Sequence, residues 1–172
     1  MVIYLIGPCA VGKSRIASEM AKRLGGVHVD VDREILSRNP RLDDGASPER
    51  WKIATGIFTE YEGAPQTKNK LCVLDIGAGE LENANAPAFF VSTSGRIVVT
   101  ILDDRQVCYR RAQERIGGYW CDKPGACYFA VEFSKEREQI YHSTSHRLVL
   151  ENQSPQAALD NLVKLVQQFG VR

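Results

Sequence analysis

Eight consecutive residues near the start of the chain have the types and the spacing of a loop that binds phosphate. They read Gly7-Pro8-Cys9-Ala10-Val11-Gly12-Lys13-Ser14 and match every fixed position of the pattern G-x-x-x-x-G-K-S/T. In such a loop the backbone N–H groups point at a polyphosphate, and glycine allows a close approach. We expect Lys13 to act catalytically by reaching the β- and γ-phosphates, and Ser14 to ligate a metal. The expected cofactors are therefore ATP and Mg²⁺.

The sequence on both sides of this loop supplies the elements that must hold it. The apolar run Val2–Ile6 is typical of a strand buried on both faces, and the loop follows it directly. A helix is predicted next, because an apolar stripe recurs at helical spacing until Gly25-Gly26 can end it. The stripe consists of Ile16, Ala17, Met20, Ala21 and Leu24. The order of strand, loop and helix favours a true phosphate site over an accidental glycine-rich turn.

Two carboxylates end the second predicted strand, which spans residues 27–32. Alternation along Val27-His28-Val29-Asp30-Val31-Asp32 places the valines on one side and both aspartates on the other. Ligands gather at the carboxyl ends of parallel strands, so we expect both aspartates near the transferred phosphoryl group. Asp30 would hold waters on Mg²⁺, and Asp32 would accept or orient the hydroxyl of the phosphoryl acceptor. The alternative for Asp32 is that it only caps the following helix.

The third predicted strand, residues 70–76, brings a competing metal ligand. Asp75 follows the apolar run Leu71-Cys72-Val73-Leu74, as a Walker B aspartate does. We prefer Asp30 for the Mg²⁺ site and keep Asp75 as the alternative.

The remainder of the chain alternates between helical and strand patterns. Helices are predicted over about 48–61, 86–94, 104–116, 128–143 and 154–169, strands over 96–102 and 147–151, and a helix followed by a turn over 33–45. The segment 117–125 has glycine at both ends and little periodicity, which predicts a mobile lid within about 117–130 that excludes water. The alternation predicts a three-layer α/β fold with a parallel sheet.

Length and charge limit the kinds of partner that the protein can bind. With 172 residues, 44% hydrophobic and 25% charged, the chain fits one domain, residues 1–172. A formal net charge of +1 with interspersed signs offers no basic stripe for nucleic acid and no polybasic membrane patch. No apolar run approaches a membrane span, and Met1 leads directly into a strand. We expect a cytoplasmic monomer whose partner is a small molecule.

The cysteines and histidines form no recognisable disulfide or metal pattern. The five cysteines lack C-x-x-C spacing, and an odd number in an intracellular protein indicates free thiols. His142 and His146 are four residues apart, but no third ligand is near them, so we interpret them as part of a solvated helix face.

Taken in order, the motifs resemble those of the shikimate kinase family from Val2 to about Val166. The phosphate loop is followed by a D-x-D motif, here Asp30 and Asp32, and then by Gly77-Ala78-Gly79 in place of a glycine triplet. The resemblance implies a P-loop kinase fold with a five-stranded parallel sheet and a lid.

The resemblance also implies an acceptor site. Arg50 stands five residues after Gly45, as the substrate arginine of the family does, and Arg137 with Tyr141 forms its late R-x-x-x-Y motif. The two residues of that motif share a helix face, and the planar fork of arginine suits a carboxylate. The acceptor site would then comprise Asp32, Arg50, Gly77, Ala78, Gly79 and Arg137, and the expected substrate is a small anionic molecule with a hydroxyl group.

Two further residues take nucleotide-binding roles by resemblance. Arg115 would approach the adenine, and Lys123 would approach the phosphates from the lid.

Four positions depart from the family pattern. Ala10 and Ala78 replace glycines, Lys123-Pro124 replaces Arg-Pro, and Ile53 stands where a glutamate usually follows the substrate arginine. Lysine keeps the charge of arginine but loses its bidentate fork, which alters the contact of the lid with phosphate. ATP-dependent chemistry is thus better supported than shikimate as the acceptor.

Three functions remain open on these residues. The first is phosphoryl transfer from ATP to a small hydroxylated acid, as in shikimate kinase. The second is O-phosphorylation of a nucleoside, sugar or antibiotic, which would not need two arginines around a carboxylate. The third is a nucleotide-binding module without turnover, which Lys13, Ser14 and Asp32 argue against.

Overall fold

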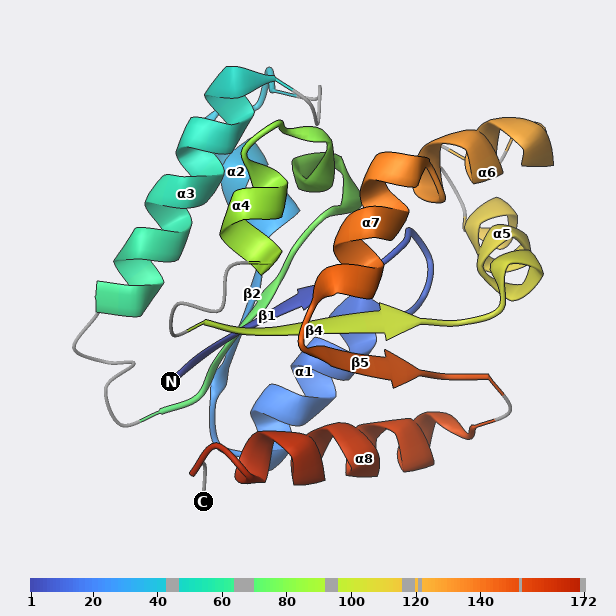
Figure 1. Ribbon diagram of the computed structural model, residues 1–172. Helices are drawn as coiled ribbons and strands as arrows, with labels where there is room; N and C mark the ends of the chain where they lie inside the picture. The colour runs from blue at the N-terminus through green and yellow to red at the C-terminus, as the bar shows by residue number, and fades with distance from the viewer. Residues whose placement is uncertain are drawn as a thin grey trace.

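The computed structural model of the protein describes residues 1–42, 47–63, 70–91, 96–115, 120, 122–151 and 153–170. Of the lid segment predicted over 117–125, residues 117–119 and 121 lie outside these ranges. The described chain forms a central sheet with helices on both faces (Figure 1). This arrangement confirms the predicted three-layer α/β fold.

The sheet has five parallel strands in the order β2-β3-β1-β4-β5. The strands are β1 (Val2–Ile6), β2 (Val27–Asp30), β3 (Cys72–Asp75), β4 (Ile97–Leu102) and β5 (His146–Val149). In the register of the sheet, Asp75 lies beside Leu5 on one side and beside Asp30 on the other. Because every strand runs the same way, the phosphate loop after β1 and the aspartates that end β2 and β3 meet at one edge.

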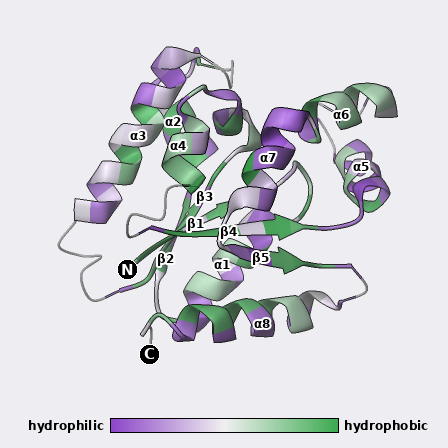
Figure 2. Cartoon of the chain, viewed as in Figure 1, coloured by the Kyte–Doolittle hydropathy of each residue, from purple (hydrophilic) through white to green (hydrophobic). Residues whose placement is uncertain are grey.

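Two hydrophobic clusters fill the space between the sheet and the helices. Within β1, Ile3 and Leu5 belong to the first cluster, and Tyr4 and Ile6 belong to the second. This alternation explains why the strand is apolar at every position. Figure 2 shows the strands as largely hydrophobic, whereas most of the helices carry both hydrophilic and hydrophobic residues.

Each cluster is covered by its own group of helices. The first packs against α1 (Lys13–Arg23), α5 (Arg105–Glu114), α6 (Gly125–Glu132) and α8 (Pro155–Gln167). The second packs against α2 (Val31–Arg38), α3 (Pro48–Gly63), α4 (Ala86–Val91), α7 (Lys135–Ser143) and the short 3₁₀ helix η2 (Ala78–Glu82). Within the described ranges, no helix is both long and apolar enough to cross a bilayer.

The structure corrects three predicted boundaries. The second strand ends at Asp30 and not at residue 32, because the Asp30 side chain accepts a hydrogen bond from Arg33 N, at 3.1 Å, and starts α2. The single helix predicted over 128–143 is two helices, since Ser134 caps a new helix through Arg137 N. The last strand ends at Val149 instead of residue 151.

Candidate functional site

The phosphate loop has a backbone that few side chains tolerate. Gly7 and Gly12 have φ values of +149° and +101°, and a Cβ on Gly7 would collide with the carbonyl oxygen of Ile101. Ala10 also has a positive φ, +63°, and is the only such non-glycine residue in the described chain. Alanine there costs about 1 kcal/mol relative to the glycine of the family pattern. The loop therefore holds a left-handed residue at position 10 without a glycine there.

Lys13 and Ser14 begin α1 at the open end of this loop. The Lys13 ammonium is buried and donates hydrogen bonds to the carbonyl oxygens of Gly7, at 2.9 Å, and Pro8, at 3.1 Å. The positive end of the α1 dipole lies at the same point, because Gly12 is its N-cap. Lys13 and Ser14 are thus placed where an anion would gain from both the charge and the helix terminus.

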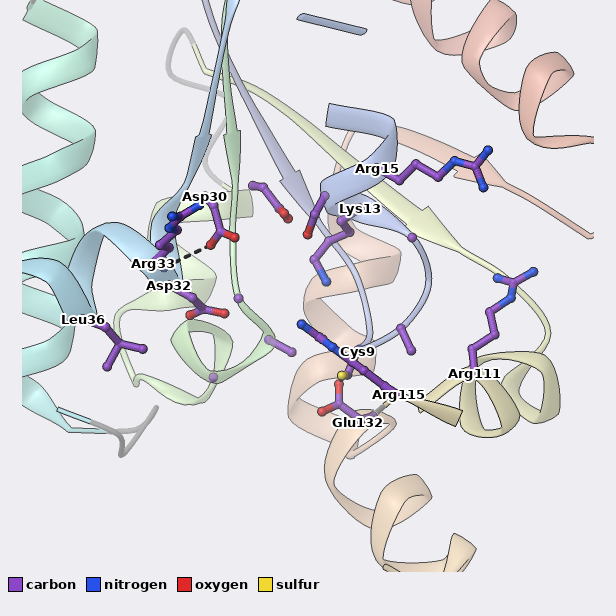
Figure 3. A pocket seen from close by; sticks show the side chains of 17 residues that line it. Cys9, Lys13, Arg15, Asp30, Asp32, Arg33, Leu36, Arg111, Arg115 and Glu132 are labelled. Carbon is purple, nitrogen blue, oxygen red and sulfur yellow. Dashed lines mark hydrogen bonds between the residues drawn. The ribbon is translucent and has the colours of Figure 1, made fainter. Parts of the chain in front are cut away.

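A cavity of about 750 Å³ opens in front of the loop. Its walls come from the loop, from the ends of β2 and β3, from α2 and from the region of α5 and α6; the residues include Cys9, Ala10, Gly12, Lys13, Ser14, Asp30, Asp32, Asp75, Gly77, Ala78, Gly79, Arg111, Arg115 and Glu132. Figure 3 shows Asp30 and Asp32 on one side of Lys13, and Arg111 on the other. The volume is large enough for a small ligand.

Three aspartates line the cavity in different ways. Asp30 is held as the cap of α2, and Asp75 is buried with His28 Nε2 3.9 Å from one of its carboxylate oxygens. Asp32 lies in the first turn of α2, half exposed to the cavity. The sequence placed Asp32 on a strand, yet the short turn into α2 still brings it to the same cavity as Asp30.

These oxygen ligands fit Mg²⁺. Within the described chain, no three His, Cys, Asp or Glu side chains group closely enough to hold a metal by themselves. Mg²⁺ rarely needs such a cage, because it keeps several waters and takes one or two protein ligands together with substrate phosphates. Ser14 together with Asp30 or Asp75 could provide those ligands, and the structure leaves the choice between the two aspartates open.

Arg50 is buried in a network of carboxylates. Its side chain donates to Glu80 Oε1 at 2.5 Å, to the carbonyl oxygen of Leu42 at 2.9 Å and to the carboxylate of Asp32. Arg50 is 5% exposed and Glu80 is 1% exposed. Burial, together with the charge of Asp32, raises the pKa of Glu80 to about 8 even though Arg50 opposes the shift.

Glu80 is a site residue that the sequence analysis missed. The family pattern places a glutamate three residues after the substrate arginine, where this chain has Ile53. Glu80 supplies a carboxylate to the same arginine from η2, directly after the Gly77-Ala78-Gly79 segment. An acidic residue next to that segment is the only sequence signal that could have suggested it.

Arg137 has a second set of carboxylate partners. Its Nη2 donates to Glu82 Oε1 at 2.7 Å, and its Nη1 lies 3.0 Å from Glu132 Oε2. Arg137 is 3% exposed. Burial alone would lower its pKa, but Glu132, Tyr141 and Glu82 outweigh that effect and raise it. Both predicted acceptor arginines therefore meet η2, one through Glu80 and the other through Glu82, and neither lines the cavity directly.

Gly77 is required at its position by the neighbouring acid. A Cβ on Gly77 would overlap the carboxylate of Asp32, so the absence of a side chain lets Asp32 approach the strand end.

The two residues expected near the nucleotide differ in position. Arg115 lines the cavity, as does Arg111, which the sequence analysis did not single out and which donates to Asp103 at 2.8 Å. Lys123 is not among the cavity residues, and its carbonyl oxygen accepts a hydrogen bond from Tyr109 at 3.2 Å.

Part of the chain is similar in sequence to a curated protein. No protein-family model matches the chain. A shikimate kinase of Streptomyces coelicolor is 29% identical over 119 residues, which cover 64% of this chain and 63% of that protein. The chain thus spans less than two thirds of the length of this relative.

Solved structures share the fold. A shikimate kinase from Bacteroides thetaiotaomicron aligns with a TM-score of 0.69 at 14% identity, covering 98% of this chain and 97% of the other. A shikimate kinase from Acinetobacter baumannii in complex with shikimate aligns with 0.65 at 18% identity, covering 98% and 91%. A gluconokinase from Sinorhizobium meliloti 1021 aligns with 0.59 at 15% identity, covering 98% and 94%. These matches confirm the predicted fold and the resemblance seen in the motifs.

Proposed function

We propose that this chain, a divergent relative of the shikimate kinases, transfers the γ-phosphoryl group of ATP to a hydroxyl of a small molecule. The observation that carries the proposal is that Lys13 and Ser14 of the phosphate loop face the same cavity as the carboxylate of Asp32. A phosphate-binding end and a group that can receive or orient a hydroxyl are the two parts that such a transfer needs.

The residues of the loop fit a nucleotide. The left-handed backbone at Gly7 and Gly12 shapes a concave surface, and the ammonium of Lys13 stands at its edge. Bound Mg²⁺ would neutralise charge on the β- and γ-phosphates, with Ser14 and either Asp30 or Asp75 as protein ligands. On binding, Lys13 would exchange the carbonyl oxygens of Gly7 and Pro8 for phosphate oxygens.

Asp32 is the group best placed to act on the acceptor. Its carboxylate lies against Gly77, is half exposed to the cavity and is held by Arg50. The arginine fixes the direction of the Asp32 carboxylate, which suits a residue that orients a hydroxyl and accepts its proton during transfer. Because Glu80 shares Arg50, it supports this arrangement from behind the wall of the cavity.

The charge of the acceptor distinguishes the remaining candidates. Arg137 does not line the cavity, but its buried Nε has no hydrogen-bond partner within the described residues, so an anionic group that reached this side chain would find a free donor. This supports an anionic hydroxy acid, with shikimate as the first compound to test. The second candidate, a nucleoside, sugar or antibiotic, is favoured by a different observation: carboxylates already accompany both arginines, so the pair carries little uncompensated positive charge.

A coupled ADP-release assay over a panel of acceptors tests the proposal. The panel contains shikimate and gluconate as anionic acceptors, and a nucleoside, a neutral sugar and an aminoglycoside as the others. We expect acceptor-dependent ADP release from one class, and a loss of about 10³-fold or more in the Lys13→Ala variant. Lys22→Ala, an exposed lysine on the same helix, is the control.

Two results would count against the proposal. Normal turnover by Lys13→Ala would remove the phosphate loop from the mechanism. Binding of ATP without acceptor-dependent turnover across a wide panel would favour the non-catalytic nucleotide-binding module.

A further inference from the structure

Glu132, the last residue of α6, contacts the phosphate loop through the backbone. Its Oε2 accepts a hydrogen bond from Cys9 N at 2.8 Å, and its neighbour one turn earlier, Tyr128, donates to the Cys9 carbonyl oxygen at 2.7 Å. Glu132 is 4% exposed and nevertheless lines the cavity, next to Cys9 in Figure 3. A carboxylate therefore accepts a hydrogen bond from one backbone N–H of the loop, and the N–H groups of such loops are the ones that bind phosphate.

The same oxygen also pairs with Arg137. Glu132 Oε2 lies 3.0 Å from Arg137 Nη1, and Arg137 reaches Glu82 on η2 with its other nitrogen. A continuous path of polar contacts thus runs from Cys9 in the phosphate loop, through Glu132 and Arg137, to the segment that follows Gly79. It joins the nucleotide end of the cavity to its acceptor end.

We propose that Glu132 is a positioning residue that couples nucleotide binding to the placement of Arg137. The inference rests on the proposed function and adds a residue to it. Phosphates entering the loop bring negative charge close to the Glu132 carboxylate, whose direct partners among the described residues are Arg137 and the Cys9 N–H. Nucleotide binding therefore depends on the Glu132–Arg137 pair, because Arg137 offsets the charge of Glu132 beside the phosphates. Arg137 influences the affinity for nucleotide in this way without contacting the nucleotide.

The affinity for ADP and Mg²⁺, measured by titration calorimetry, tests this without any acceptor. We expect Arg137→Gln to weaken ADP binding roughly tenfold, because Glu132 then remains uncompensated beside the phosphates. Glu132→Gln should tighten ADP binding several-fold, since the amide keeps the shape but carries no charge. In the double variant, which carries both substitutions, Arg137→Gln should have no further effect. Its ADP affinity should equal that of Glu132→Gln alone.

Further variants separate this role from a purely structural one. Arg137→Lys keeps the charge and should retain most of the ADP affinity that Arg137→Gln loses, whereas a packing role would suffer from both changes. Glu138→Gln alters an acid on α7 that pairs with Arg105 at the surface, and it should leave ADP binding unchanged. Thermal unfolding of each variant checks that it is folded.

The inference is overturned if the two substitutions act additively on ADP affinity, or if Glu132→Gln binds ADP no more tightly than the unchanged protein. The second criterion stands even if Arg137→Gln does not fold. Failure of the proposed function looks different, because it appears as absent acceptor-dependent ADP release or as normal turnover after Lys13→Ala, and neither result alters the outcome of the ADP titrations.

Discussion

At the scale of residues, acids and bases in the site come in matched sets. Arg50 is shared by Asp32 and Glu80, and Arg137 is shared by Glu82 and Glu132. The two pairs with both partners buried, Arg50–Glu80 and Arg137–Glu132, give little net stability, because desolvation offsets their attraction, but breaking one leaves an unpaired buried charge. Beside the cavity, these ion pairs fix the direction in which each side chain points.

Asp32→Asn should lower kcat by about 10²- to 10³-fold and change ATP affinity little. The amide keeps the size of the side chain but accepts no proton and supports no charge on the attacking oxygen. Steady-state kinetics with the acceptor found in the panel provides the measurement, with ATP affinity from calorimetry. Equal small changes in both quantities would leave Asp32 without a part in the transfer, since the residue that caps α2 is Asp30.

Asp30→Asn should raise the Mg²⁺ concentration needed for half-maximal activity, while Asp75→Asn should do so less. Asp30 is at the cavity wall and already fixed by its cap hydrogen bond, whereas Asp75 is more deeply buried beside His28. A Mg²⁺ titration at saturating ATP distinguishes the two aspartates. A larger effect for Asp75→Asn would make Asp75 the metal-supporting residue.

At the scale of elements, the break between α6 and α7 brings the parts of the site together. Glu132 ends the first helix and Arg137 lies in the first turn of the second. In one continuous helix, residues five positions apart would point in different directions. The turn at Phe133 and Ser134 lets the two side chains face each other, and periodicity alone did not reveal it.

Ser134→Ala should lower the free energy of unfolding by about 1 kcal/mol, because it removes the N-cap of α7. Ser18→Ala, an exposed serine in the interior of α1, is a suitable control, since its loss removes no cap. Urea unfolding of both variants gives the comparison. If the two serines proved equally dispensable, the cap would not be what separates the helices.

At the scale of the whole molecule, the strands that lead to the site are anchored in two hydrophobic clusters, one on each face of the sheet. Residues on opposite faces of β1 pack into separate clusters, so the strand that precedes the phosphate loop is anchored twice. Glu80 is an acid buried in the folded protein, and its protonation therefore links the site to the stability of the whole fold.

Stability should therefore fall as pH rises through the range in which Glu80 titrates. Its pKa is raised from 4.5 to about 8 in the folded protein, so between these values the folded state binds more protons than the unfolded chain. The resulting loss is at most about 1.4 kcal/mol per pH unit. Urea unfolding across this range should show a steeper decline for the unchanged protein than for Glu80→Gln.

The exposed acid Glu136 supplies the control for this measurement, because Glu136→Gln should keep the slope of the unchanged protein. Identical slopes for Glu80→Gln and the unchanged protein would mean that Glu80 titrates alike in both states.

The features that depend only on residues close together in the sequence could be predicted from the sequence. The phosphate loop is one contiguous stretch, and the apolar runs and helical stripes around it predicted the order of strands and helices. Asp30 and Asp32, which the sequence puts at the end of the second strand, both line the cavity, even though the strand ends earlier than predicted. Local spacing determines these features, so they need no knowledge of distant contacts.

The tertiary structure alone decided which charges meet. Arg50 and Glu80 are 30 residues apart in the chain, Arg137 and Glu82 are 55 apart, and Cys9 and Glu132 are 123 apart. No periodicity connects such positions, because they approach only when parallel strands bring their carboxyl ends to one edge and the helices close over it. The sequence identified the arginines, but their carboxylate partners follow from the packing of η2, α6 and α7.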